Sequence, residues 1–192
     1  MKKLKLYLAG PEVFLPNVTE IKNKKLEICN DFGFIGLFPI DDKPLPTLQT
    51  KSQVGLYIYK HNQQLIKQAN GVIANISPFR SVSIDPGTAW EIGYSDALNR
   101  ALFAYTNNPL LFADRVNAQY STNIINGLKY GNDNIQIEDF DLIDNLMIVG
   151  SIYDSTKSLI ISDIERELGD LTLFEFAVIE AKKYFNAMEH ID

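Results

Sequence analysis

Several features that would signal a particular chemistry are scarce in this 192-residue chain or missing from it. Cys29 is its single cysteine, so the chain can form neither an internal disulfide nor a metal site built on cysteines. The two histidines, His61 and His190, stand too far apart to suggest a metal site. We expect His61 to be a partly exposed structural residue and His190 to be solvated near the chain end.

Long apolar runs are also missing. No run approaches the roughly 20 residues that span a bilayer, and the apolar stretch 6–10 is too short for the core of a signal peptide. We therefore expect a cytoplasmic protein that has no membrane partner. Length and a hydrophobic fraction of 46% favour one domain over residues 1–192.

Positive charge is in short supply. The chain has 18 Lys and Arg against 24 Asp and Glu, a net charge of -6. Binding to a phosphate backbone needs clustered Lys and Arg, so we do not expect a nucleic-acid partner. Gly10 alone does not make a glycine-rich phosphate loop, and we expect no metal or organic cofactor.

Short apolar runs alternate with helical periodicity along the chain. The runs predict strands buried on both faces, at residues 4–9, 34–40, 71–76 and 101–105, with 146–149 as a weaker candidate. Helices are expected after Asn17, which could form a capping pair with Glu20, and at residues 52–70, 86–99 and 157–188.

This alternation predicts an α/β fold with a parallel sheet of about five strands and helices on both faces. In such sheets ligands bind beyond the carboxyl ends of the strands. The segments after Ala9, Ile40 and Ile76 are therefore where we expect chemistry.

Residues 77–91 follow a predicted buried strand and lead into a helix. Asp85 and Pro86 form a strong helix start, because Asp caps and Pro fits the first helical position. Glu91 then lies inside a helix that is apolar over most of its circumference, where a carboxylate is costly to bury without a partner. Together the two carboxylates could serve as nucleophile and proton donor. The alternative is that Glu91 makes an ordinary helix-dipole contact and that Asp85 is only a cap.

Five segments of the chain resemble the nucleoside 2-deoxyribosyltransferase family. They occur in the family's order, include the six-residue spacing from Asp85 to Glu91, and cover most of residues 4–150. The segments are YLAGPEVF at 7–14, GLFPID at 36–41, ANISPFR at 74–80, DPGTAWEIGY at 85–94 and DNLM at 144–147.

The resemblance implies a flavodoxin-like sheet, a homo-oligomer, and deoxynucleosides and free nucleobases as substrates. At the position of Glu91 the family has a glutamate that attacks the anomeric carbon and carries the sugar as an ester until a second base displaces it. Asp85 matches a residue that holds or protonates the departing base, and Tyr7 matches a tyrosine that orients the nucleophile. Asn145 and Met147 match a segment that reaches into the neighbouring subunit's site.

Other residues are expected to bind substrate. Phe79 could stack on a base, and Arg80 could bind a polar edge or pair with an acid. For Asp41 a turn-forming role before the prolines is an equal alternative. The expected substrate-binding residues are Gly10, Phe14, Asp41, Asn62, Phe79, Arg80, Asn145 and Met147.

The chain departs from the family pattern at several positions. Lys43 stands where members carry an amide that meets the base, and Asn62 where some carry an Asp. Ser81 stands at an expected glycine. Residues 110–141 match nothing in the family and are expected to be an insertion or a lid.

Two alternatives to deoxyribosyl transfer remain open. One is an N-glycosidase that hydrolyses 2'-deoxynucleoside 5'-monophosphates, in which Arg80, Ser81 and Ser83 would bind the phosphate. The other is a nucleotide sensor without catalytic activity, which would bind its ligand and not turn it over.

Overall fold

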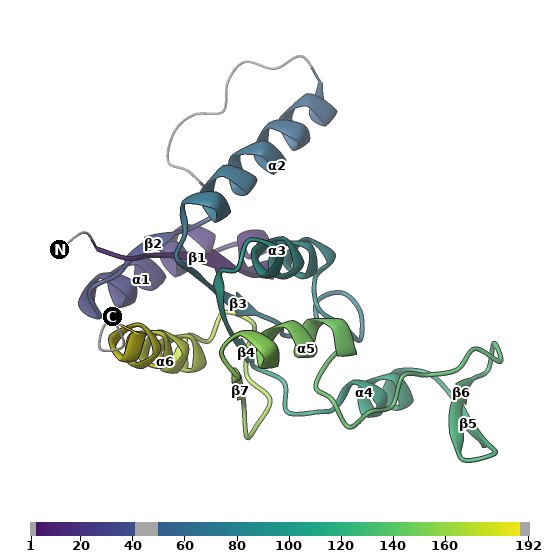
Figure 1. The fold of residues 1–192 in the computed structure, drawn as a ribbon. Coiled ribbons are helices and arrows are strands. Elements are labelled where there is room, and N and C mark those ends of the chain that lie inside the picture. Colours follow the sequence, from purple (N-terminus) through teal and green to yellow (C-terminus); the bar gives the residue numbers. More distant parts are fainter. Residues whose placement is uncertain (1–2, 41–49, 189–192) are drawn as a thin grey trace.

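The computed structural model describes residues 3–40 and 50–188 and is built around a five-stranded parallel sheet. The strand order is β2-β1-β3-β4-β7, and each neighbouring pair is parallel (Figure 1). The strands are β1 (Lys5–Ala9), β2 (Ile35–Leu37), β3 (Gly71–Asn75), β4 (Ala101–Thr106) and β7 (Ser158–Ile161).

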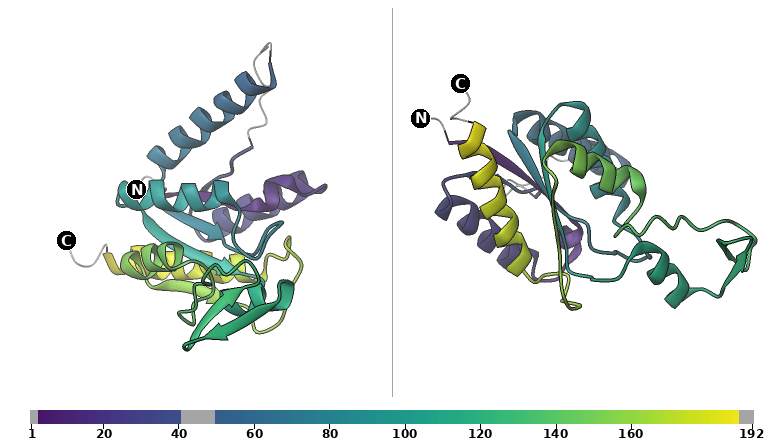
Figure 2. Two further views of the ribbon diagram at one scale, coloured as in Figure 1. Left: turned by 90° about the vertical axis from the view of Figure 1, so that its right-hand side faces the viewer. Right: turned by 60° about the horizontal axis from the view of Figure 1, so that its bottom comes forward.

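Helices cover both faces of this sheet, as the alternating pattern predicts (Figure 2). One face carries α1 (Val18–Asp31) and α6 (Thr172–Met188), whose apolar residues pack with Leu6 and Leu8 of β1. The other carries α2 (Lys51–Gln68), α3 (Pro86–Ala97) and α5 (Leu146–Ser155), which pack with Tyr7 and Ala9. Successive side chains of a strand point to opposite faces, so β1 supplies both cores.

Some helix starts follow local sequence signals and others do not. Asp85 caps α3 through a hydrogen bond that its side chain accepts from the backbone of Thr88, and Pro86 is the first helical residue, as predicted. The predicted cap of α1 is wrong in its detail. Asn17 holds the cap position, but its side chain makes no capping hydrogen bond.

The prediction was wrong for the last strand of the sheet. Residues 146–149 begin helix α5, because an apolar run this short does not distinguish a strand from a buried helix. Asn145 caps that helix by accepting a hydrogen bond from Met147 N. The fifth strand is β7, which lies within the predicted helix 157–188. It starts directly after Lys157, whose positive φ of 59° cannot continue a helix.

Residues 110–141, predicted from the sequence to be an insertion or a lid and here named the insertion, extend away from the sheet (Figure 1). The insertion contains α4 (Phe112–Gln119) and an antiparallel hairpin of β5 (Thr122–Ile125) and β6 (Leu128–Gly131). Asn126 and Gly127 connect the strands, both with positive φ, as a tight hairpin turn requires. Sequence analysis overlooked this Asn-Gly signal. Among the described residues, no helix is both long and apolar enough to cross a membrane.

Candidate active site

A cavity of about 320 Å³ opens next to the carboxyl end of β1. The short 3-10 helix η1 (Pro11–Phe14) follows β1 directly and forms one wall. Helices α2 and α3 contribute further walls. The lining residues are Gly10, Val13, Phe14, Pro39, Ile40, Ile58, Asn62, Asp85, Gly87, Thr88 and Glu91.

Glu91 presents its carboxylate to this cavity from α3. The Tyr7 hydroxyl, from the fully buried middle of β1, donates a short hydrogen bond to Glu91 Oε1. Burial raises the pKa of Glu91 to about 7; the bond from Tyr7 opposes that shift and the negative charge of Asp85 adds to it. Burial also raises the pKa of Tyr7, so its hydroxyl keeps its proton and remains a donor. The carboxylate is therefore held in one orientation and changes charge near neutral pH.

Asp85 lies at the start of the same helix and also lines the cavity. Its Oδ2 accepts hydrogen bonds from Thr88 N at 2.9 Å and Thr88 Oγ1 at 3.2 Å. The two interpretations of Asp85 are therefore compatible. Its side chain caps α3, and the same side chain is the second carboxylate of the cavity. The cap fixes the place from which Asp85 acts on the charge of Glu91.

A buried ion pair supports the wall that follows β1. Glu12 accepts hydrogen bonds from the Lys25 ammonium and from the Tyr105 hydroxyl, the latter at 2.7 Å. Lys25 also lies 4.7 Å from the ring centre of Phe174. A Cβ added to Gly10 would come within 2.0 Å of Glu12 Oε2. Gly10 is therefore required by the close approach of the Glu12 carboxylate.

Aromatic rings stack beside the cavity. Phe14 lies parallel to Phe79, with ring centres 5.3 Å apart. The Arg80 guanidinium lies over both rings, 5.0 Å from the centre of Phe79 and 5.9 Å from that of Phe14. Phe14 is 58% exposed, so the stack is open to solvent on the cavity side.

Asn62 contributes an acceptor without a partner. Its Oδ1 is buried and accepts no hydrogen bond from any described residue. Because buried polar atoms are nearly always hydrogen-bonded in folded proteins, an unpaired acceptor in a cavity wall indicates a place for a donor of a ligand.

Comparison with known proteins assigns the chain to a family. The family model described as nucleoside 2-deoxyribosyltransferase matches residues 6–147. The chain belongs to this family. All eleven residues that line the cavity fall within the matched segment, so the cavity is part of the deoxyribosyltransferase domain.

Solved structures share the fold of this family member. A 2-desoxiribosyltransferase from Leishmania mexicana superposes with a TM-score of 0.62 over 93% of this chain and 97% of that one, at 24% sequence identity. A conserved protein from Enterococcus faecalis V583 superposes with a TM-score of 0.54 over 94% and 99% of the two chains, at 14% identity. These similarities concern the fold.

A relative in sequence comes from Schizosaccharomyces pombe. It is an uncharacterized protein that is 33% identical to this deoxyribosyltransferase family member over 113 residues. The match covers 58% of this chain and 54% of the relative, so this chain spans about half the length of that protein.

The structure brings together most of the site residues expected from the family resemblance. Gly10, Phe14, Asn62, Asp85 and Glu91 all line the cavity. Three further expected residues lie around it: Tyr7 contacts Glu91, and Phe79 and Arg80 stack on Phe14.

Two expected residues lie elsewhere. Asn145 and Met147 are at the start of α5 and do not line the cavity of their own chain, and Met147 is 70% exposed. Their predicted contact with a neighbouring subunit stays a prediction. Asp41 and the neighbouring Lys43 lie outside the described residues.

Sequence reasoning missed part of the cavity lining. Ile58 had a usable signal, because it stands four residues before Asn62 and so shares its helix face. Val13 precedes the predicted site residue Phe14, and Thr88 stands between Asp85 and Glu91 in the sequence. Neither residue type by itself signals a binding site. Within residues 3–40 and 50–188, no group of three or more His, Cys, Asp or Glu side chains is arranged to hold a metal ion.

Proposed function

We propose that this enzyme-family member transfers 2-deoxyribose between nucleobases through a covalent ester on Glu91. The observation that carries the proposal is the pair of carboxylates in one cavity, with Glu91 oriented by a tyrosine hydroxyl and Asp85 fixed by a helix cap. A retaining double displacement needs these two groups, a nucleophile and a proton donor, on the two sides of one reacting bond.

In the first step a Glu91 carboxylate oxygen bonds to C1' of a bound deoxynucleoside. The glycosidic C–N bond breaks, its electron pair stays on the base nitrogen, and Asp85 holds or protonates that base. In the second step a nitrogen of another base attacks C1', the ester bond breaks, and its electron pair returns to Glu91. If Asp85 protonated the departing base, it regains a proton from the incoming nitrogen. If Asp85 only held the departing base, that base leaves as an anion and takes up the proton that the incoming base releases. In both cases the two residues end as they began.

The Glu91 pKa suits this role. A nucleophile must lose its proton to attack, and a group with a pKa of about 7 is partly ionised at neutral pH. Deoxyribose lacks the electron-withdrawing 2'-hydroxyl, so positive charge develops readily at C1' and one carboxylate can suffice. The desolvation that raises the pKa also strengthens the attraction between an ionised Glu91 and that developing charge.

Two of the three side chains that could bind a 5'-phosphate already donate hydrogen bonds to other groups of the protein, which favours a nucleoside over a nucleotide. The Ser83 hydroxyl donates to buried Asp144, and the Ser81 hydroxyl donates to Ser83 O at 3.1 Å. Arg80 alone of the three residues required by the glycosidase alternative keeps a free polar surface.

Mass spectrometry of the protein mixed with a deoxynucleoside tests the proposal directly. We expect a mass increase of one deoxyribosyl group located on Glu91, and its loss when a second base is added, together with a new nucleoside. Glu91→Gln preserves shape and should form no adduct. Glu175→Gln, at an exposed position on α6, should form it normally.

Each other outcome points to a different function. Sugar release that a second base does not change, with no new nucleoside, would mean hydrolysis. A 5'-monophosphate that reacts in preference to the nucleoside would identify the glycosidase. Binding of a deoxynucleoside without adduct formation, sugar release or transfer would support the alternative of a nucleotide sensor without catalytic activity.

A further inference from the structure

A buried ion pair lies at the base of the insertion, outside the cavity. Arg115 of α4 and Asp144, just before α5, approach to 2.9 Å between Nη2 and Oδ2. Their side chains are 6% and 0% exposed. Removing two charges from water is costly, and an isolated pair often fails to recover that cost. The other contacts of the two residues are therefore informative.

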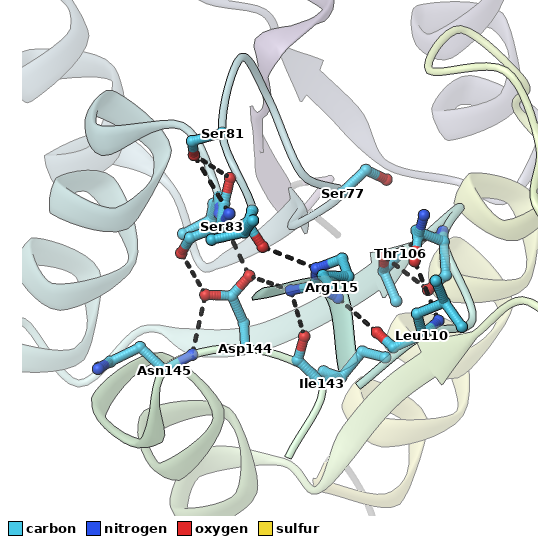
Figure 3. Close-up of polar contacts among 12 residues, drawn as sticks. Ser77, Ser81, Ser83, Thr106, Leu110, Arg115, Ile143, Asp144 and Asn145 are labelled. Atoms are coloured by element: carbon cyan, nitrogen blue, oxygen red, sulfur yellow. Dashed lines mark hydrogen bonds and ion pairs between the residues drawn. The ribbon is translucent and has the colours of Figure 1, made fainter. Parts of the chain in front are cut away.

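Each side-chain nitrogen of Arg115 donates a hydrogen bond to a backbone carbonyl oxygen in a different segment of the chain. Its Nε donates to Val82 O at 2.7 Å, and Nη1 donates to Leu110 O at 2.5 Å. Nη2 donates to Ile143 O at 2.7 Å as well as to Asp144. One guanidinium thus joins the loop after β3 to Leu110, where the insertion begins, and to Ile143, just after it ends (Figure 3).

Asp144 completes the connection from the other side. Its Oδ1 accepts hydrogen bonds from Ser83 Oγ and from Asn145 N, the latter at 2.8 Å. Its Oδ2 accepts one from Ile84 N at 3.2 Å. Both carboxylate oxygens are therefore occupied by groups that directly precede Asp85 or directly precede α5.

The loop held in this way belongs to neither the sheet nor a helix. Between β3 and α3 its own contacts are few: Phe79 N donates to Ser83 O at 3.0 Å, and Ser81 bonds with Ser83. Ser83 and Ile84 are tied to Asp144, and the next residue is Asp85. The ion pair therefore holds the backbone that leads into Asp85, whose carboxylate caps α3.

We propose that Arg115 and Asp144 are positioning residues that hold Asp85 in place for the reaction and attach the insertion to the same loop. This inference rests on the proposed function. It gives the insertion a part in the site, because α4 supplies the guanidinium. A positional error near one ångström in a reacting group lowers rates by roughly 100-fold, so such a restraint is consequential.

Three variants loosen this restraint to different degrees. Ser83→Ala removes one hydrogen bond and leaves the ion pair intact, so it should fold normally. Asp144→Asn and Arg115→Lys weaken the pair itself. Arg166→Lys is the matched control, since Arg166 bonds with Ser162 and Asp163 in a loop that does not contact residues 82–85 in any described interaction.

Two measurements on the whole protein are combined. Hydrogen exchange of residues 79–90 reports whether the loop is held, and does not need activity. We expect faster exchange there in the Ser83 and Asp144 variants and no change in Arg166→Lys. The rate of ester formation on Glu91, per molecule able to form it, should fall roughly tenfold in Ser83→Ala and roughly 100-fold in Asp144→Asn, with little change in KM.

A double-mutant cycle separates positioning from general damage to the fold. If Ser83 acts through Asp85, then Ser83→Ala should change the rate by at most about twofold in an Asp85→Asn background. An equal loss in both backgrounds would overturn the proposal, and so would unchanged exchange or faster exchange with a normal rate. A parent protein that forms no ester would instead refute the proposed function, and the exchange data would still decide whether the ion pair holds the loop.

Discussion

Replacing Tyr7 by Phe should move the pH dependence of the reaction toward higher pH. The substitution removes one oxygen atom and keeps the ring that fills the core. It deletes the hydrogen bond that the hydroxyl donates to Glu91 Oε1, a bond that lowers the pKa of Glu91 against the larger effect of burial. The charged form of Glu91 then loses its donor, while the protonated form loses little.

The size of the shift follows from the strength of that bond. A hydrogen bond to a charged group contributes about 1.5–3 kcal/mol, and one pKa unit corresponds to about 1.4 kcal/mol. The pKa of Glu91, about 7 in the parent protein, should therefore rise by about one to two units in the variant. At neutral pH the ionised fraction, and with it the rate of ester formation, falls roughly 5-fold to 50-fold.

The assay is the pH profile of kcat/KM for deoxyribosyl transfer, because that ratio reports the ionisations of the free enzyme. The parent should show an acid limb near pH 7, and Tyr7→Phe should show the limb displaced to higher pH with much of its activity regained in alkaline buffer. Tyr105→Phe is the matched control. It removes another buried hydroxyl that donates to a carboxylate, that of Glu12, and should leave the limb in place.

A limb that stays near pH 7 in Tyr7→Phe would refute the assignment of this ionisation to Glu91. A limb that moves equally in Tyr105→Phe would mean that the pH dependence reflects general packing. A rate lost uniformly at every pH would show that Tyr7 orients Glu91 without changing its proton affinity.

Three further predictions follow from the buried groups. Lys25→Met leaves the Glu12 carboxylate buried with the Tyr105 hydroxyl alone and should lower the free energy of unfolding in urea by about 3–5 kcal/mol; a loss below 1 kcal/mol would mean that water enters and solvates Glu12. Glu91 binds its proton more tightly in the folded protein than in the unfolded chain, so the free energy of unfolding of the parent should fall by roughly 3 kcal/mol as pH rises from about 4.5 to above 7. Glu91→Gln should not show this loss. Parallel curves of unfolding free energy against pH for the two proteins would contradict the raised pKa. Asn62→Leu removes the unpaired acceptor and should raise KM for the deoxynucleoside roughly tenfold while leaving thermal stability unchanged or higher, and an unaltered KM would exclude Asn62 from substrate binding.

The predictions from sequence succeeded where a local pattern has one dominant outcome. Apolar runs bounded by polar residues became β1, β3 and β4, and Asp85 with Pro86 started α3. They failed where a short pattern is compatible with two structures. Residues 146–149 formed a helix because Asn145 caps it and the helix continues to Ser155, neither of which periodicity over four residues can show.

Part of the site could also be predicted from the sequence. The motif with Asp85 and Glu91 marked the two carboxylates, and the rule for parallel sheets marked the segment after Ala9. Sequence could not show that Glu12, Lys25 and Tyr105 would meet beneath Gly10, since they come from three separate elements. The same holds for the ion pair between Arg115 and Asp144.

The sequence by itself determined the layered fold and the residues on which the proposed chemistry rests, because helix capping, strand burial and motif spacing depend on neighbouring residues. Only the tertiary structure decided the environment of each charge. The pKa of Glu91 depends on how completely packing removes it from water and on a tyrosine 84 residues away in sequence. Electrostatic energy depends on distance in space and on local solvation, and neither is encoded in the order of neighbouring residues.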